Sequence, residues 1–112
     1  MTSRVLNVEV NDRGLPLTMR DWGISVMAWR KRKGFKTSWK NMMEKLMLVV
    51  TELAEAAEDY RHDNKEHFKE EIADTFIRLF DICGSLGIDI ESEIAKKMKT
   101  NEDRPFKHNK KC

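Results

Sequence analysis

The chain has 112 residues, of which 40% are hydrophobic and 36% charged, and its formal net charge is +2. This length allows one domain over residues 1–112, and the low content of glycine (5) and proline (2) excludes collagen-like and low-complexity chains. Apolar runs are too short for a membrane span, and two cysteines offer no disulfide framework. We therefore expect a cytoplasmic protein without a membrane partner.

The first third of the chain is expected to hold an N-terminal extension (residues 1–17) and one helix. Residues 5–10 are suited to a short strand, but no stretch alternates long enough for a sheet. Thr18 is a good N-cap residue, and apolar residues then recur at helical spacing as far as Trp29. Since Gly34 favours termination, we predict a helix that begins after Thr18 and ends before Gly34.

Two longer helices are predicted next, with a short polar break at residues 62–64 between them. Ser38 is a suitable N-cap for the first, whose apolar stripe is expected to face the core. This stripe consists of Leu46, Val49, Val50, Leu53, Ala56, Ala57 and Tyr60. The second is expected to turn inward Phe68, Ile72, Phe76, Leu79, Phe80 and Cys83. Because the break is short, the two helices should be antiparallel neighbours.

A short fourth helix is predicted after Asp89, which is a favourable N-cap, and Pro105 should end regular structure. Residues 99–112 then form a basic tail. The fold class predicted from these elements is all-α, a small bundle of about four helices around an antiparallel hairpin.

Four carboxylates stand at matched spacing on the two long helices. Glu52 and Glu55 are three residues apart, as are Glu71 and Asp74, and residues at this spacing share a helix face. In a hairpin the four can converge on one partly buried spot, where protons, cations or water must relieve their repulsion. Carboxylate-only ligands favour magnesium or manganese, and iron is disfavoured because the ferritin-like Glu-x-x-His pattern is not matched. The alternative is that these acids merely face solvent.

Basic and polar residues lie in and after the fourth helix. Lys97, Asn101, Arg104 and Lys110 are donors suited to phosphate oxygens, the arginine as a planar fork and the lysines as point charges. Such a segment, folded over an acidic metal site, would complete a phosphate clamp. The alternative is a solubilising tail.

Three segments in this order resemble a known family: LMLVVTELAEAAEDYR (residues 46–61), EEIADTFIRLFD (70–81) and KMKTNEDRPFKHNKK (97–111). Together they are similar to the MazG-like, all-α nucleoside triphosphate pyrophosphohydrolases, whose pattern is E-E-x-x-E followed by E-x-x-D. The four acids match this pattern, except that Thr51 stands at its first position. The family's K-x-x-x-N-x-x-R-P segment is matched by Lys97, Asn101, Arg104 and Pro105.

The resemblance implies magnesium-dependent cleavage of a nucleotide between the α and β phosphates, which gives a monophosphate and pyrophosphate and suits a role in cleansing the nucleotide pool. It also implies a homodimer or homotetramer. Glu52 or Glu55 is the expected catalytic carboxylate, in addition to its role as a ligand, because it can orient or deprotonate water. Lys97 and Arg104 would steady the charge that develops on the pyrophosphate.

Base recognition is expected from the first third of the chain, where Trp39 beside the basic run of residues 30–40 offers a ring for stacking. Two other classes of function stay open. A nucleic-acid-binding module would use the basic run and the tail on phosphates, although the acidic middle of the chain disfavours it. A helical interaction protein without catalysis would keep the acids only for solubility.

Overall fold

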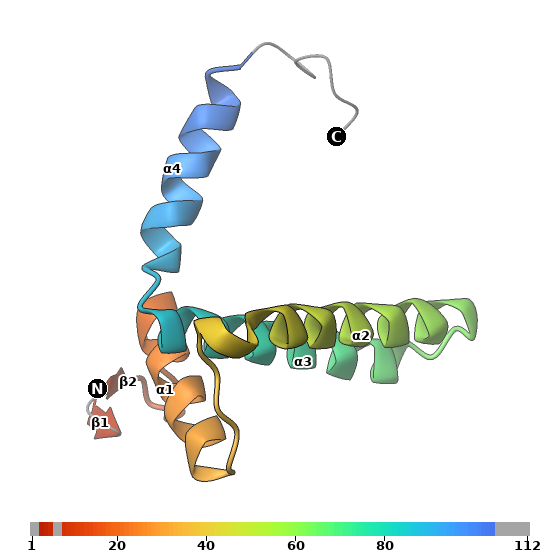
Figure 1. Ribbon diagram of the computed structural model, residues 1–112, viewed down its shortest axis with the longest axis horizontal. Helices are drawn as coiled ribbons and strands as arrows, with labels where there is room; N and C mark the ends of the chain where they lie inside the picture. The colour runs from red at the N-terminus through yellow and green to blue at the C-terminus, as the bar shows by residue number, and fades with distance from the viewer. Residues whose placement is uncertain (1–2, 6–7, 105–112) are drawn as a thin grey trace.

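The computed structural model describes residues 3–5 and 8–104, and within them the chain is mainly helical (Figure 1). The elements in order are β1 (Ser3–Val5), β2 (Val8–Val10), α1 (Met19–Arg32), the 3-10 helix η1 (Trp39–Asn41), α2 (Met42–Arg61), α3 (Lys65–Leu86) and α4 (Ile90–Glu102). The predicted all-α class is confirmed. Instead of the one short strand predicted over residues 5–10, the chain has two, β1 and β2, which pair antiparallel in a two-stranded sheet. No helix in the described ranges is both long and apolar enough to cross a membrane.

Thr18 and Asp89 begin α1 and α4 as predicted. Ser38, predicted to begin the long second helix, caps η1 instead, α2 has no side-chain cap, and Asn64, predicted only as part of the polar break, caps α3. Thr18, Ser38, Asn64 and Asp89 each accept a hydrogen bond from a backbone N–H in the first turn of α1, η1, α3 and α4, respectively. Gly87 ends α3 with a φ of 68°, a left-handed conformation that glycine adopts with little strain. The polar break at residues 62–64 is a tight turn, so α2 and α3 lie antiparallel as predicted (Figure 1).

The first helix crosses α3 at a pair of glycines. A Cβ added to Gly84 would lie 2.8 Å from the carbonyl carbon of Gly23, so no side chain separates the two backbones. Next to this crossing, the ring of Trp22 stacks on that of Phe80 with centroids 6.2 Å apart. Glycine at position 84 therefore permits close packing of α1 against α3.

A buried ion pair holds the loop after α1 against α3. Arg30 Nε donates to Asp81 Oδ2 over 2.8 Å, and both side chains are almost fully buried. Thr37 Oγ1 and Ser85 Oγ also donate to the Asp81 carboxylate, at 2.6 and 3.1 Å. The guanidinium of Arg30 further lies 4.3 Å from the ring centre of Phe35. Arg30 is thereby buried and cannot contribute to a surface formed by the basic run of residues 30–40.

The predicted inward stripe of α2 is largely exposed, so that prediction was wrong for much of its length. Leu46, Val50 and Leu53 are 42%, 52% and 48% exposed, and Tyr60 is 77% exposed. On α3, Phe76 is 55% exposed. The reason is that α2 packs against one long neighbour within the described residues, α3, which covers only one line of its side chains. The buried line of α2 consists of Lys45, Val49, Glu52 and Ala56.

The last helix extends away from the α2–α3 hairpin (Figure 1). Near its beginning, Glu91 Oε1 accepts a hydrogen bond from the backbone N–H of Met19 over 2.6 Å. All its residues from Glu91 onward are exposed, Ile94 and Met98 included. The radius of gyration is 16.5 Å, against about 13 Å for a compact domain of this length. The chain by itself thus leaves apolar faces of α2, α3 and α4 uncovered.

Candidate metal centre

Three of the four predicted carboxylates converge between α2 and α3. Glu52 and Glu71 are buried, at 8% and 5% exposure, and Glu55 is exposed. One carboxylate oxygen from each lies within 4.8 Å of the others. The antiparallel pairing of the helices explains this meeting, because it sets the middle of α2 opposite the first half of α3. We call these three residues the carboxylate trio.

Arg78 fixes the charge state of Glu52. Its Nε donates to Glu52 Oε1 over 3.0 Å, from a position seven residues after Glu71 on α3. Burial opposes ionisation of Glu52, but hydrogen bonds with Glu71 and Arg78, together with the arginine's charge, outweigh it and lower the pKa of Glu52. Glu52 is therefore a carboxylate at neutral pH. Arg78 was not predicted as a site residue, although its spacing from Glu71 places both on one helix face.

Glu71 has one carboxylate oxygen, the buried Oε2, without a hydrogen-bond partner among the described residues. Its hydrogen bond with Glu52, its burial and the neighbouring Glu55 raise the pKa of Glu71 to about 7. A buried carboxylate oxygen in this state needs a proton or a cation. Three oxygen ligands, one of them without a donor, fit a hard divalent ion such as magnesium or manganese.

Asp74, the fourth predicted ligand, is exposed and lies outside the trio. The buried line of α3 passes from Glu71 to Thr75, four residues on, and Thr75 is only 7% exposed. Because each helical residue turns the chain by about 100°, Asp74 falls on the flank of the interface rather than in it. Three of the four carboxylates that were expected to converge therefore do so, and Asp74 does not.

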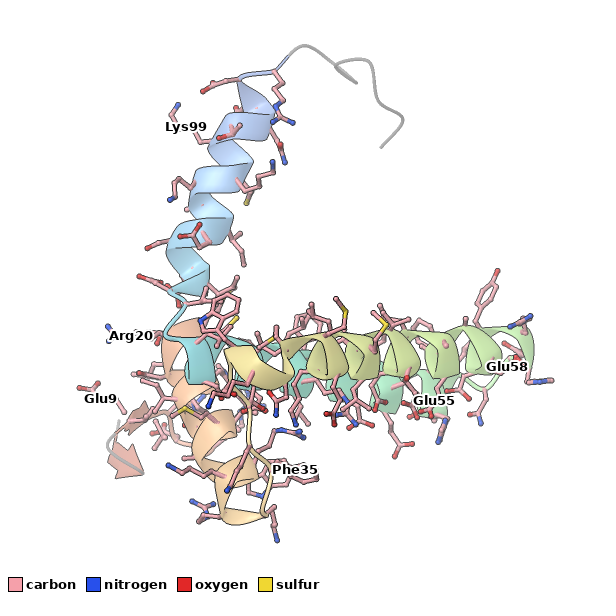
Figure 2. The ribbon with its side chains drawn as sticks, viewed as in Figure 1. Glu9, Arg20, Phe35, Glu55, Glu58 and Lys99 are labelled. Atoms are coloured by element: carbon pink, nitrogen blue, oxygen red, sulfur yellow. The ribbon has the colours of Figure 1, made fainter. Side chains whose placement is uncertain are left out.

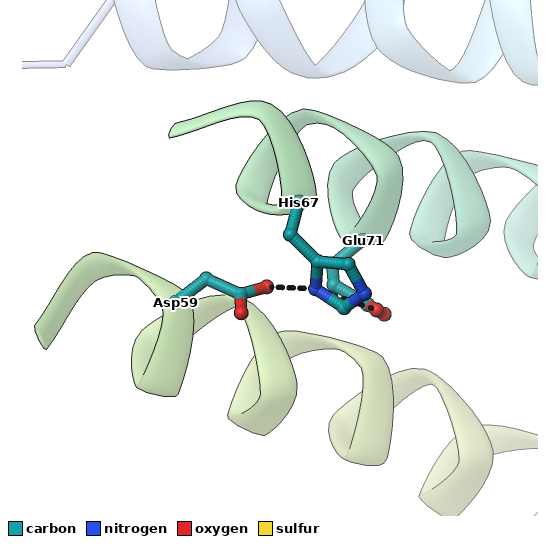
Figure 3. Close-up of side chains that lie close together, drawn as sticks. All are labelled: Asp59, His67 and Glu71. Carbon is teal, nitrogen blue, oxygen red and sulfur yellow. Dashed lines mark hydrogen bonds and ion pairs between the residues drawn. The ribbon is translucent and has the colours of Figure 1, made fainter. Parts of the chain in front are cut away.

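A second cluster consists of Asp59, His67 and Glu71 (Figure 3). It adjoins the trio and shares Glu71 with it. His67 Nδ1 lies 2.8 Å from Asp59 Oδ2 and 3.6 Å from Glu71 Oε1. The hydrogen bond with Asp59 and the charge of that carboxylate raise the pKa of His67. Sequence analysis gave His67 no role, although its spacing of four residues from Glu71 was the available signal.

A cavity of about 480 Å³ opens along α2 beside both clusters. Its wall includes Thr51, Glu55, Asp59 and His67. The exposed edge of the trio and that of the second cluster thus face one hollow that is widely open to solvent.

The predicted substrate-binding residues do not join the carboxylates within one chain. Lys97, Asn101 and Arg104 are exposed in or just after α4, and Figure 2 shows Lys99 of this helix far from Glu55 on α2. Trp39 is 75% exposed in η1. The helical rise per residue puts it about 20 Å along the helix axis from Glu52. Lys110 lies outside the described residues.

No family model, curated protein or solved structure matches the chain.

Proposed function

We propose that the protein is a divalent-cation-dependent nucleotide pyrophosphohydrolase, which cleaves a nucleoside triphosphate between the α and β phosphates. Its products would be a nucleoside monophosphate and pyrophosphate. The observation that carries the proposal is the carboxylate trio, two of whose members are buried and in which Glu71 Oε2 has no donor among the described residues. The substrate class is supported by the resemblance of the three segments to the MazG-like enzymes.

In this proposal Glu52, Glu55 and Glu71 hold magnesium, or manganese in its place. Exposed Asp74, one turn further along α3, would have to turn from solvent to join them. The bound ion would neutralise phosphate oxygens and lower the pKa of a coordinated water. The chemistry of the donors supports this choice, since carboxylate oxygens are the ligands that these ions prefer.

The carboxylates of the trio would have different roles, which depend on their surroundings. Arg78 keeps Glu52 ionised and oriented through the 3.0 Å bond between Nε and Oε1. Glu55 is exposed at the cavity wall, where an attacking water would reach it, so it is the better candidate for the catalytic base. Glu52 would serve chiefly as a ligand, because its Oε1 is engaged by the arginine.

The proposal includes a homodimer or homotetramer. The uncovered stripe on α2 and the extended α4 leave apolar residues that a second copy would bury, among them Leu53 and Ile94. The same association offers a route by which Lys97 and Arg104 of one copy approach the trio of the other. Sedimentation measurements at several protein concentrations test the assembly. A monomer at micromolar concentration would refute this part alone.

The activity is tested with a panel of canonical and damaged nucleoside triphosphates in magnesium, with pyrophosphate and orthophosphate measured separately. Glu71→Gln and Glu55→Gln should each lower turnover by at least about 100-fold, in line with the loss of a positioned catalytic group. Glu44→Gln is the matched control, because this glutamate is exposed on the same helix, distant from the trio.

Three results would overturn the proposal or redirect it. Equal turnover in Glu71→Gln and in wild type would refute the site. Release of orthophosphate as the first product would refute cleavage at the α–β bond. If no nucleotide is hydrolysed and magnesium has no effect on the stability of the fold, a helical interaction protein is favoured. Salt-sensitive DNA binding without metal would instead favour a nucleic-acid-binding module.

A further inference from the structure

We propose that Asp59, His67 and Glu71 form a second divalent-cation site, which takes an ion of the zinc class and shares Glu71 with the carboxylate trio. The three residues each offer one ligand atom, and these atoms lie within 4.8 Å of one another. The site does not rest on the proposed hydrolysis of nucleotides, because only Glu71 is common to the two clusters. We call it the histidine site.

The turn between α2 and α3 places the histidine site. The backbone N–H of Asn64 donates to the Asp59 carbonyl oxygen over 2.8 Å, which closes the turn at the end of α2. The side chain of Asn64 then caps α3 by accepting from the backbone N–H of His67. His67 is thus held in the first turn of α3, directly across from the last turn of α2 that carries Asp59.

The distances suit shared coordination. His67 Nδ1 lies 2.8 Å from Asp59 Oδ2 and 3.6 Å from Glu71 Oε1. Two ligands bound to zinc at about 2.0–2.2 Å in tetrahedral geometry stand about 3.4 Å apart. A small opening of the Asp59–His67 contact would therefore admit an ion, while the Glu71 contact already has the required separation.

The surroundings of the imidazole support ligation through Nδ1. The other ring nitrogen, Nε2, faces Glu70 Oε2 at 3.9 Å. This separation is too long for a hydrogen bond, so Glu70 would have to approach Nε2 to accept the second ring N–H, as carboxylates commonly do for metal-bound histidines. The His67 side chain is 50% exposed beside the cavity on α2, so an ion has a path of entry, whereas Asp59 and Glu71 are 15% and 7% exposed.

The ligand chemistry separates the two sites. An imidazole nitrogen with two carboxylates suits zinc, cobalt or nickel, whereas the all-oxygen trio suits magnesium. Glu71 can serve both sites because Oε1 faces His67 while Oε2 is buried without a donor among the described residues. A bridging carboxylate offers one oxygen to each of two ions. The two sites would then hold different ions, magnesium in the trio and zinc in the histidine site.

The competing reading is an ion pair in which protonated His67 bridges the two carboxylates with no metal. Zinc binding distinguishes the two, because an ion must displace the proton on Nδ1 whereas an ion pair gives no uptake. The test uses zinc, and cobalt as its coloured substitute, with full-length protein in 5 mM magnesium. All proteins carry Cys112→Ser, so that the terminal thiol cannot supply a ligand.

The matched pair of variants is His67→Gln and His62→Gln. His62 also lies near a carboxylate, with Nε2 3.8 Å from Glu58 Oε1, but its side chain is 76% exposed and it belongs to no candidate cluster among the described residues. We expect one equivalent of zinc in wild type and in His62→Gln. His67→Gln should weaken binding by more than about 100-fold, since loss of an outer partner alone costs about 10–100-fold.

Two further measurements give the result a direct signature. Zinc should shift the Nδ1 resonance of His67 in nitrogen-15 spectra, and circular dichroism should show that His67→Gln is folded. Asp59→Asn should weaken zinc binding with magnesium binding unchanged, whereas Glu52→Gln should weaken magnesium binding with zinc retained. Failure of the magnesium arm alone would count against the proposed function and leave the histidine site standing.

Equal zinc affinity in His67→Gln and His62→Gln would overturn the proposal. So would the absence of zinc uptake by wild type, in which case the cluster is an ion pair. Zinc binding that is lost in Glu52→Gln but kept in His67→Gln would also overturn it, because the ion would then occupy the trio.

Discussion

Lowering the pH from 8 to 6 should weaken magnesium binding to the carboxylate trio about tenfold. The pKa of Glu71 is raised to about 7, and a carboxylate must lose its proton before it binds a metal. Its ionised fraction is about 0.9 at pH 8 and about 0.1 at pH 6, which gives the ratio of ten. Glu52 does not add to this change, because Arg78 and Glu71 lower its pKa despite burial.

The same carboxyl group makes the metal-free protein less stable as the pH rises. The pKa of Glu71 is about 7 in the folded chain and 4.5 as its ordinary value, so the folded state binds more protons between these limits. This contribution is fully present below about pH 4.5 and is lost as the pH rises to about 7. The pKa of His67 is also raised, so its contribution is present below its ordinary value of 6.5 and is lost as the pH passes its folded value.

Isothermal titration with magnesium at pH 6, 7 and 8 measures the first effect, and thermal unfolding in a chelator measures the second. Glu71→Gln should remove magnesium binding. It should also remove the pH-dependent part of the stability that Glu71 supplies, whereas the part that His67 supplies should remain. Glu44→Gln should behave as wild type does. A magnesium dissociation constant that is the same at pH 6 and pH 8 would refute the inference that Glu71 must lose a proton before it binds magnesium.

The other predictions concern the packing that positions the site, and urea unfolding followed by circular dichroism measures each. Gly84→Ala should cost about 3 kcal/mol, the upper end for overpacking, because the new Cβ would press on the backbone of Gly23. Gly23→Ala should stay within about 1 kcal/mol of wild type, since its Cβ would approach no atom closer than 3.4 Å; equal losses in the two variants would contradict the close crossing. Asp81→Ala should cost about 3–5 kcal/mol, because it leaves Arg30 charged and buried without its partner, and a loss under 1 kcal/mol would show that this pair does not anchor the loop. Asn64→Ala should cost about 1 kcal/mol by removing the N-cap of α3, and an unchanged midpoint would contradict that role.

The helix ends were predictable because caps act locally. Thr18 and Asp89, both predicted as N-caps, each satisfy a backbone N–H within three residues of themselves, so no distant contact is needed to choose them. The meeting of Glu52 with Glu71 was also foreseeable, since a short turn forces two long helices to run side by side. In both cases the information lies within a few residues or within one hairpin.

Arg78 and His67 show what local reasoning could not reach. Each has a polar partner on the opposite helix, Glu52 and Asp59, and the rotation of α2 against α3 decides which side chains meet. The apolar stripe pointed to the wrong rotation. It assigned Leu53 to the interior, whereas packing buries Glu52 and leaves Leu53 48% exposed.

The sequence by itself determined where α1 and α4 begin, that the long pair of helices folds back on itself, and that Glu52 and Glu71 stand on neighbouring helices. Only the tertiary structure decided which face of each helix is covered, and with it that three acids meet while Asp74 stays in solvent. The physical reason is that backbone capping and helical period depend on neighbours along the chain. The rotation of one helix against another is instead set by the sum of contacts across their whole interface, which no single stripe of residues encodes.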